Sequence, residues 1–126
     1  MKLHTGSIVL VDLDPTLGQE QRGIRSCIVV SDPDVVMDQR FPVLCIVPVT
    51  STAGDGLLYP ALKPGTSGLT KASWALVDHV RSIDKRRIRC GFGAIPFTEM
   101  RAVDEALTVF LGISGENGAP RSDSLH

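Results

Sequence analysis

Short apolar runs rich in Val, Ile and Leu, separated by Gly, Pro and Asp turns, make up most of residues 1–95. Runs of this length and composition are typical of β-strands rather than helices. They predict five or six strands, at residues 8–13, 27–30, 43–49, 57–62, 73–83 and 89–95. No helical pattern separates these runs, which excludes a parallel βαβ architecture.

Residues 73–83 show a clear alternation of side chains. One face of this predicted strand carries Trp74, Leu76, Asp78 and Val80, and the other carries Ala75, Val77, His79 and Arg81. Successive side chains of a strand point to opposite faces of the sheet. We therefore expect Asp78 and His79 to point away from each other and not to face one site.

One helix is predicted, and it follows Pro96. Thr98 is a suitable N-cap, and Gly112 ends the helix. Apolar residues recur at helical spacing between them and predict a packing face: Met100, Val103, Leu107, Phe110 and Leu111. We therefore expect a mainly β fold with one C-terminal helix, a small and strongly curved barrel in a single domain at residues 1–112. Residues 113–126 are expected to form a flexible polar tail.

The composition is that of a globular protein, with 43% hydrophobic and 21% charged residues in 126. No apolar run approaches the roughly 20 residues that span a membrane. The N-terminus also lacks the apolar stretch and small-residue site of a signal peptide. We expect a cytoplasmic protein that does not enter a membrane.

The cysteines and histidines show no metal-ligand spacing. Cys27 and Cys45 lie in apolar runs, and no Cys-x-x-Cys motif includes Cys90. We expect inert thiols rather than a disulfide framework or a zinc site. No metal and no other cofactor is predicted.

Two basic clusters are present although the net charge is only −1. Residues 85–87 read Lys-Arg-Arg with Arg89 nearby, and Arg22 lies close to Arg25. Such clusters attract a phosphate chain, because a local field can differ from the net charge. The alternative for residues 85–89 is a solvated turn.

Three polar segments interrupt the apolar runs, at residues 18–25, 48–51 and 78–84. Each has a structural alternative, because Arg25 could be an edge residue, Thr50 a strand end and Asp78 a turn residue. Together they fit the cleavage of RNA without a metal. That reaction needs a base for the ribose 2′-OH, an acid for the leaving 5′-oxygen and a group that stabilises the charged phosphorane.

Arginine and threonine suit the charged transition state, because the guanidinium fork matches phosphate oxygens and a hydroxyl can donate to them. Arg25 and Thr50 are the candidates for this role. Glu20 and Asp78 are the candidates for accepting or relaying a proton. His79 is placed second, because histidine is the usual acid or base near neutral pH.

The same segments resemble the three motif blocks of the MazF/PemK-like toxins. The first block reads GSIVLVDLDPTLGQEQRGIR at residues 6–25, the second PVTS at 48–51 and the third VDHVRSID at 77–84. Their order and spacing agree with the family over about residues 6–112. This resemblance implies an SH3-like barrel, a homodimer and a toxin of a type II toxin-antitoxin system.

The resemblance also implies an mRNA interferase, which cleaves single-stranded RNA and leaves a 2′,3′-cyclic phosphate and a 5′-hydroxyl. A cognate antitoxin is the implied protein partner. By motif position Arg25 and Thr50 correspond to catalytic residues, Glu20 to a site glutamate and Asp78 to the base proposed in the PemK branch. The expected RNA-binding residues are Gln19, Gln21, Arg22, Ser51, His79, Arg81, Lys85 and Arg86.

The chain departs from the family pattern at three positions. Ser26 replaces the usual proline, Leu76 replaces the arginine acid of the PemK branch and Gln19 replaces a histidine. The PemK proton scheme therefore does not carry over whole, and a mechanism centred on Arg25 and Thr50 is favoured. Two alternatives stay open: a non-catalytic, CcdB-like toxin that binds DNA gyrase, and a catalytically silent interaction domain.

Overall fold

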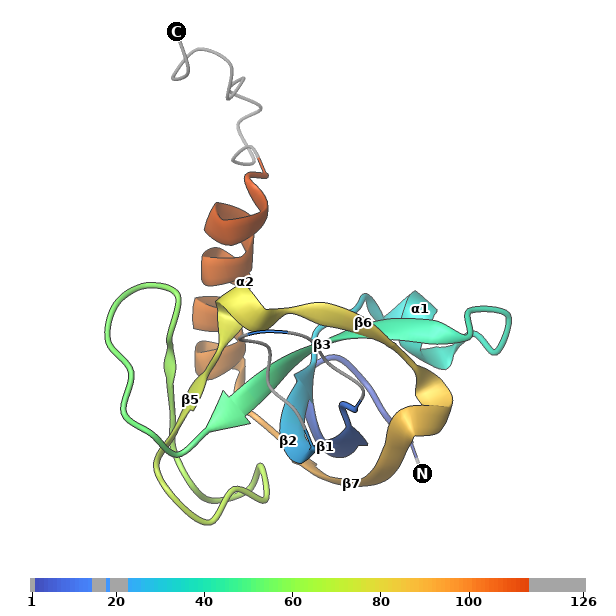
Figure 1. Cartoon of the computed structure of the whole chain (residues 1–126), viewed down its shortest axis with the longest axis horizontal. Coiled ribbons are helices and arrows are strands. Elements are labelled where there is room, and N and C mark those ends of the chain that lie inside the picture. Colours follow the sequence, from blue (N-terminus) through green and yellow to red (C-terminus); the bar gives the residue numbers. More distant parts are fainter. Residues whose placement is uncertain (1, 15–17, 19–22, 114–126) are drawn as a thin grey trace, which may run out of the picture.

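The structure is a computed structural model that describes residues 2–14, 18 and 23–113. In these residues the chain forms seven strands, two α-helices and two 3-10 helices (Figure 1). In chain order they are β1 (Ser7–Asp12), β2 (Ile24–Val29), α1 (Pro33–Met37), β3 (Val43–Thr50), β4 (Ala61–Leu62), β5 (Ser73–Ala75), η1 (Val77–His79), β6 (Arg81–Asp84), η2 (Lys85–Arg87), β7 (Ile88–Ala94) and α2 (Phe97–Leu111). Neither α-helix is long and apolar enough to cross a membrane, as far as the described residues go.

The strands form one antiparallel sheet in the order β4-β5-β3-β2-β1-β7, with β6 also paired to β3. The sheet curls strongly, and α2 lies against one side of it (Figure 1). The predicted fold class, a curved β-barrel with one C-terminal helix, is therefore confirmed.

Alternating side chains of the strands fill two hydrophobic cores. The first includes Ile8, Ile28 and Val47, and α2 covers it with Met100, Val103 and Ala106. The second core lies on the other face of the strands and consists of Val9, Val11, Leu13, Cys27, Val29, Leu44, Ile46 and Ile83. Strands buried on both faces explain why the sequence shows near-continuous apolar runs.

The predicted strand at residues 73–83 is wrong, because the 3-10 helix η1 divides it into β5 and β6. Both pieces pair with β3, through Val49↔Ala75 and Ile46↔Arg81. Val49 and Ile46 are three positions apart in β3, whereas their partners Ala75 and Arg81 are six positions apart. The three surplus residues form η1 (Val77–His79), so strand alternation does not hold at Asp78 and His79.

The other differences concern short elements and helix ends. Only Ala61–Leu62 of the predicted strand at 57–62 is a strand. The helix α1 was not predicted; it begins after Asp32, whose side chain accepts a hydrogen bond from the Asp34 N–H at 2.8 Å. Thr98 is not an N-cap, because α2 starts at Phe97 without a side-chain cap.

The apolar stripe of α2 is only partly a packing surface. Phe110 and Leu111 are 44% and 54% exposed. Gly112, with φ 69°, ends the helix as predicted. The predicted tail lies outside the described residues from 114 onward.

All three cysteines are free thiols. Cys27 is fully buried, and this burial raises the pKa of its thiol to about 12. A thiol with that pKa is almost never a thiolate near neutral pH, so Cys27 is chemically inert in the folded protein. Cys45 and Cys90 are partly exposed.

Candidate active site

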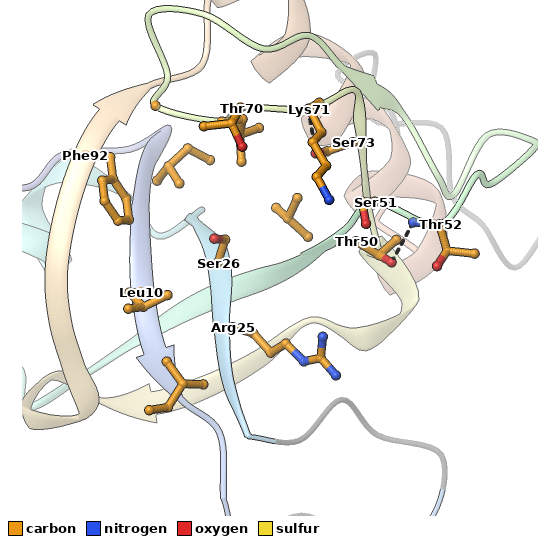
Figure 2. A pocket seen from close by; sticks show the side chains of 15 residues that line it. Leu10, Arg25, Ser26, Thr50, Ser51, Thr52, Thr70, Lys71, Ser73 and Phe92 are labelled. Carbon is orange, nitrogen blue, oxygen red and sulfur yellow. Dashed lines mark hydrogen bonds between the residues drawn. The ribbon is translucent and has the colours of Figure 1, made fainter.

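A cavity of about 410 Å³ opens at the point where β1, β2 and β3 meet the segment 68–73 (Figure 2). Its apolar lining includes Leu10 from β1, Ile24 from β2 and Phe92 from β7. Its polar lining residues are Arg25, Ser26, Thr50, Ser51, Thr52, Thr70, Lys71 and Ser73. Two of the predicted catalytic residues, Arg25 and Thr50, thus share one cavity.

The pairing of β2 with β3 explains why Arg25 and Thr50 meet. Cys27 lies opposite Pro48 in this antiparallel pair. This pairing ends at Cys27 and Pro48, and Arg25 and Thr50 each lie two positions beyond these last paired residues on their own strands. Side chains two residues apart in a strand share a face, so Arg25 and Thr50 continue the face of Cys27 and Pro48 and line the same cavity.

The Thr50 hydroxyl is held in place by the chain that follows it. Its Oγ1 accepts a hydrogen bond from the Thr52 N–H at 3.1 Å. A hydroxyl that accepts one bond can still donate its own proton. Thr50 can therefore donate to a phosphate oxygen in the cavity.

Lys71 is a further cation of this cavity, and no sequence motif indicates it. It lies across from Arg25, and its side chain points into the same space (Figure 2). The two cations and the hydroxyls between them suit a phosphate group.

The loop that carries Lys71 is fixed by close contact with β7. A Cβ at Gly93 would lie 1.8 Å from the carbonyl oxygen of Thr66, so only glycine fits there. The Gly93 N–H donates to the Ser67 carbonyl at 3.0 Å. The distance between Lys71 and the sheet is thereby set by backbone contacts.

Asp78 and His79 lie together, contrary to the prediction that they face opposite ways. The His79 Nε2 is 3.7 Å from the Asp78 Oδ1, because both belong to η1 and not to a strand. The other carboxylate oxygen of Asp78 accepts a hydrogen bond from the Tyr59 hydroxyl at 2.7 Å. Asp78 does not line the Arg25–Thr50 cavity.

The cations of the run at residues 85–89 are largely engaged by other groups of the protein. Lys85 donates its three N–H groups to the carbonyls of Val35, Val36 and Asp38, at 2.7, 3.2 and 3.1 Å. Its predicted role as an RNA-binding surface cation therefore conflicts with the structure, since its donors are already engaged. These contacts hold α1 over the second core, against which Val35 and Val36 pack.

The arginines of this run also have partners. Arg86 pairs with Asp84 at 2.9 Å, and Arg89 lies 3.5 Å from Asp12. Arg87 donates to the carbonyls of Asp12 and Asp14. The pair with Arg86 lowers the pKa of Asp84 to about 2. This run therefore presents less free positive charge than its sequence indicates.

Residues 15–17 and 19–22 of the first motif block lie outside the described residues, and with them Gln19, Glu20, Gln21 and Arg22. The residues that flank them are described and well anchored. The Gly23 N–H donates to the Asp14 carboxylate at 3.0 Å, and the Leu13 N–H to the Gly23 carbonyl at 2.9 Å. Arg81, a predicted RNA-binding residue, donates to the Leu13 carbonyl at 3.2 Å.

The sequence matches the model of the PemK-like, MazF-like toxin of type II toxin-antitoxin systems over residues 4–111. The chain belongs to this toxin family. The MazF of Deinococcus radiodurans has a similar structure, with a TM-score of 0.73 and 28% sequence identity over 88% of this chain and 97% of that one. A MazE–MazF complex from the same organism gives a TM-score of 0.67 and 25% identity, covering 89% and 97%.

A mycobacterial endoribonuclease in complex with its cognate antitoxin shares the fold at 17% identity, with a TM-score of 0.73 and coverage of 90% and 99%. Within the described part of this MazF/PemK-like chain, no group of three or more His, Cys, Asp or Glu side chains is arranged to hold a metal ion. The second motif block of the family provides Thr50 and Ser51 to the cavity. The third provides Asp78, which lies beside Tyr59 and His79.

We predict that Lys85→Ala lowers the free energy of unfolding of this MazF/PemK-like protein by about 1–3 kcal/mol, because three carbonyls lose a charged donor. Denaturant unfolding measures this change. The matched control is Arg86→Ala, whose side chain is 91% exposed and which should change stability by less than about 0.5 kcal/mol. Lost RNA binding by Lys85→Ala at full stability would instead restore Lys85 to the RNA-binding surface.

Proposed function

We propose that this MazF/PemK-like toxin is an endoribonuclease that cleaves single-stranded mRNA at a short sequence. The observation that supports this most is the convergence of Arg25, Thr50 and Lys71 on one cavity. A guanidinium, a hydroxyl and an ammonium around one space can neutralise a phosphate and the extra charge of its transition state. A toxin that only binds gyrase has no need of this arrangement.

The proposed reaction begins with attack of the ribose 2′-oxygen on the adjacent phosphorus. The bond to the 5′-oxygen breaks, and this oxygen takes up a proton from a general acid or from water, which leaves a 2′,3′-cyclic phosphate and a 5′-hydroxyl. Arg25 stabilises the charge on the non-bridging oxygens, and Thr50 donates a hydrogen bond to them. Glu20, which lies outside the described residues, is our candidate for accepting the 2′-OH proton.

The cavity also suits the bases and the chain that flank the cleaved phosphate. Ser51 and Lys71 line its polar side, and Phe92, part of its apolar lining, is 54% exposed. Single-stranded RNA is commonly bound by phosphate contacts together with stacking of bases on aromatic rings. We include these three residues in the proposed RNA-binding surface.

We further propose a cytoplasmic homodimer that is inhibited by a cognate antitoxin. Exposed apolar side chains support an interface between copies of the chain, since Val109, Phe110, Leu111 and Ile113 gather at the end of α2. Similarity to the MazE–MazF complex supports the antitoxin as a partner. We propose that the RNA crosses the dimer interface.

Cleavage should persist in EDTA and should yield cyclic phosphate and 5′-hydroxyl ends. The 2′-OH mechanism needs only side-chain proton transfer and the cations of the cavity. Mapping of 5′-hydroxyl ends in total RNA treated with the protein measures both the products and the cut sequence. A strict Mg²⁺ requirement or 5′-phosphate products would exclude the mechanism, and inhibition of gyrase supercoiling without RNA cleavage would favour the CcdB-like alternative.

Arg25→Ala should lower kcat by about two to three orders of magnitude, because a charge partner of the transition state is lost. Arg25→Lys should recover only part of this, since the bidentate fork is missing. Arg40→Ala is the control, because Arg40 is 88% exposed and pairs with Asp38 outside the cavity. Cleavage by Arg25→Ala at the rate of Arg40→Ala would place the active site elsewhere.

The antitoxin and RNA should compete for the Arg25–Thr50 cavity, because the positive electrostatic field of its cations attracts carboxylates as well as phosphates. An acidic segment that folds on binding can exploit this attraction. Titrating an RNA with a 2′-deoxy cleavage position into a preformed toxin–antitoxin complex measures the competition. RNA affinity that is unchanged at saturating antitoxin would show that inhibition acts at a distance.

A further inference from the structure

A second cavity, of about 390 Å³, lies next to the first and shares Thr50 and Thr52 with it. Its other lining residues are Ala53, Gly54, Tyr59 and Leu76. The carboxylate of Asp78 lines neither cavity, although its motif position suggests a role in catalysis. Tyr59 lines the second cavity and donates a hydrogen bond to the Asp78 carboxylate.

Within the described residues, the side chain of Asp78 accepts its hydrogen bond from Tyr59. The phenol donates to the Asp78 Oδ2 at 2.7 Å. The Asp78 Oδ1 is buried and has no hydrogen bond within the described part of the chain. The His79 Nε2 is 3.7 Å from this oxygen, which is too far for a hydrogen bond. Within the described residues, the hydrogen bond of this carboxylate therefore goes to Tyr59 and not to a side chain that lines the Arg25–Thr50 cavity.

The ring of Tyr59 packs against the segment that follows Thr50. A Cβ at Gly54 would lie 2.9 Å from the Cβ of Tyr59 and 3.7 Å from the Cδ1 of Trp74. Gly54 therefore lies directly against these two aromatic side chains. Because the Thr52 N–H binds the Thr50 hydroxyl oxygen, the position of this segment also orients Thr50.

We propose that Tyr59 is a positioning residue for Thr50, and that Asp78 acts through Tyr59 rather than as a proton acceptor in contact with RNA. Asp78 orients the phenol, the ring supports the segment at 51–54, and this segment orients the Thr50 hydroxyl. The proposal rests on the proposed ribonuclease function. A misplacement of about 1 Å at a reacting group can lower a rate by roughly a hundredfold, so the support acts on kcat.

The decisive comparison is between Asp78→Asn and Asp78→Ala. Asparagine keeps an oxygen that accepts the phenol hydrogen bond but is not a base at neutral pH. With an RNA oligonucleotide that carries the mapped cut site, Asp78→Asn should keep kcat within about threefold, and its pH–rate profile should not change. Asp78→Ala and Tyr59→Phe should each lower kcat by about ten- to a hundredfold at nearly constant KM.

The double variant Asp78→Ala/Tyr59→Phe should be no slower than the slower single variant, because both changes remove the same interaction. A direct base predicts a different result: Asp78→Asn as slow as Asp78→Ala, loss of the acidic limb of the pH profile, and a nearly normal rate for Tyr59→Phe. That pattern would overturn the proposal.

Two spectroscopic measurements test the same coupling without RNA, since the chain has one tyrosine and one tryptophan. The hydrogen bond to Asp78 raises the pKa of the Tyr59 phenol, so Asp78→Ala should lower this pKa in a tyrosinate absorbance titration. The fluorescence of Trp74, which lies beside Gly54, should shift in Asp78→Ala and Tyr59→Phe but stay at the wild-type position in Asp78→Asn.

These measurements separate the two proposals. Wild-type protein that cleaves no RNA would overturn the proposed ribonuclease, and the positioning of Thr50 in that reaction with it. Normal RNA cleavage with an unchanged tyrosine titration in Asp78→Ala would overturn only the role of Tyr59. An unshifted Trp74 spectrum in a slow Tyr59→Phe variant would also contradict it, because the slow rate would then have another cause.

Discussion

The register between β2 and β3 is the constraint on which the site depends. In this register Cys27 lies opposite Pro48, and the alternate apolar side chains of both strands lie in the second core. Arg25 and Thr50 lie at one end of the same face of the strand pair. A slip of one residue would exchange the two faces of a strand and bury polar groups. The hydrophobic cores, which stabilise one register, therefore also bring the two proposed catalytic side chains together.

Pro48 shows how the same strand accommodates two partners on its other edge. Its carbonyl accepts a hydrogen bond from the Leu76 N–H at 2.8 Å, so its nitrogen faces the same edge, where η1 interrupts the pairing. Proline has no N–H to donate, and the missing donor falls where β5 has ended and β6 has not begun. A residue that is unfavourable in most central strands therefore disturbs no ladder bond here.

Local patterns predict the elements that are decided locally. Apolar runs place β1, β2, β3 and β7, and the spacing of Met100 and Val103 places α2. The break at η1 was missed because alternation of side chains continues through residues 73–83, while the break comes from the register of β5 and β6 on β3. Tertiary pairing of this kind leaves no local signal.

The candidate site shows the same division between motif and tertiary structure. Arg25 and Thr50 follow from motif blocks, whereas Lys71 enters the cavity only because its loop packs on Gly93. Lys85 shows the converse, since its place in a basic run indicates a phosphate contact and its actual partners are carbonyls of a helix that was not predicted. A charge run indicates cations, but only the fold decides which of them reach the solvent.

Close backbone contacts divide the molecule into a rigid centre and two supported loops. The sheet carries Arg25 and Thr50, while the loop after Thr50 rests on Tyr59 at Gly54, and the loop before β5 rests on β7 at Gly93. Each contact needs a residue without a Cβ, because a methyl group would overlap its neighbour. The loops line the two cavities and the sheet supplies the groups at their junction, so loop side chains can change which bases are accepted without moving Arg25 or Thr50. In the proposed ribonuclease, substitutions in these loops would therefore change the RNA sequence that is cut and leave the cleavage chemistry in place.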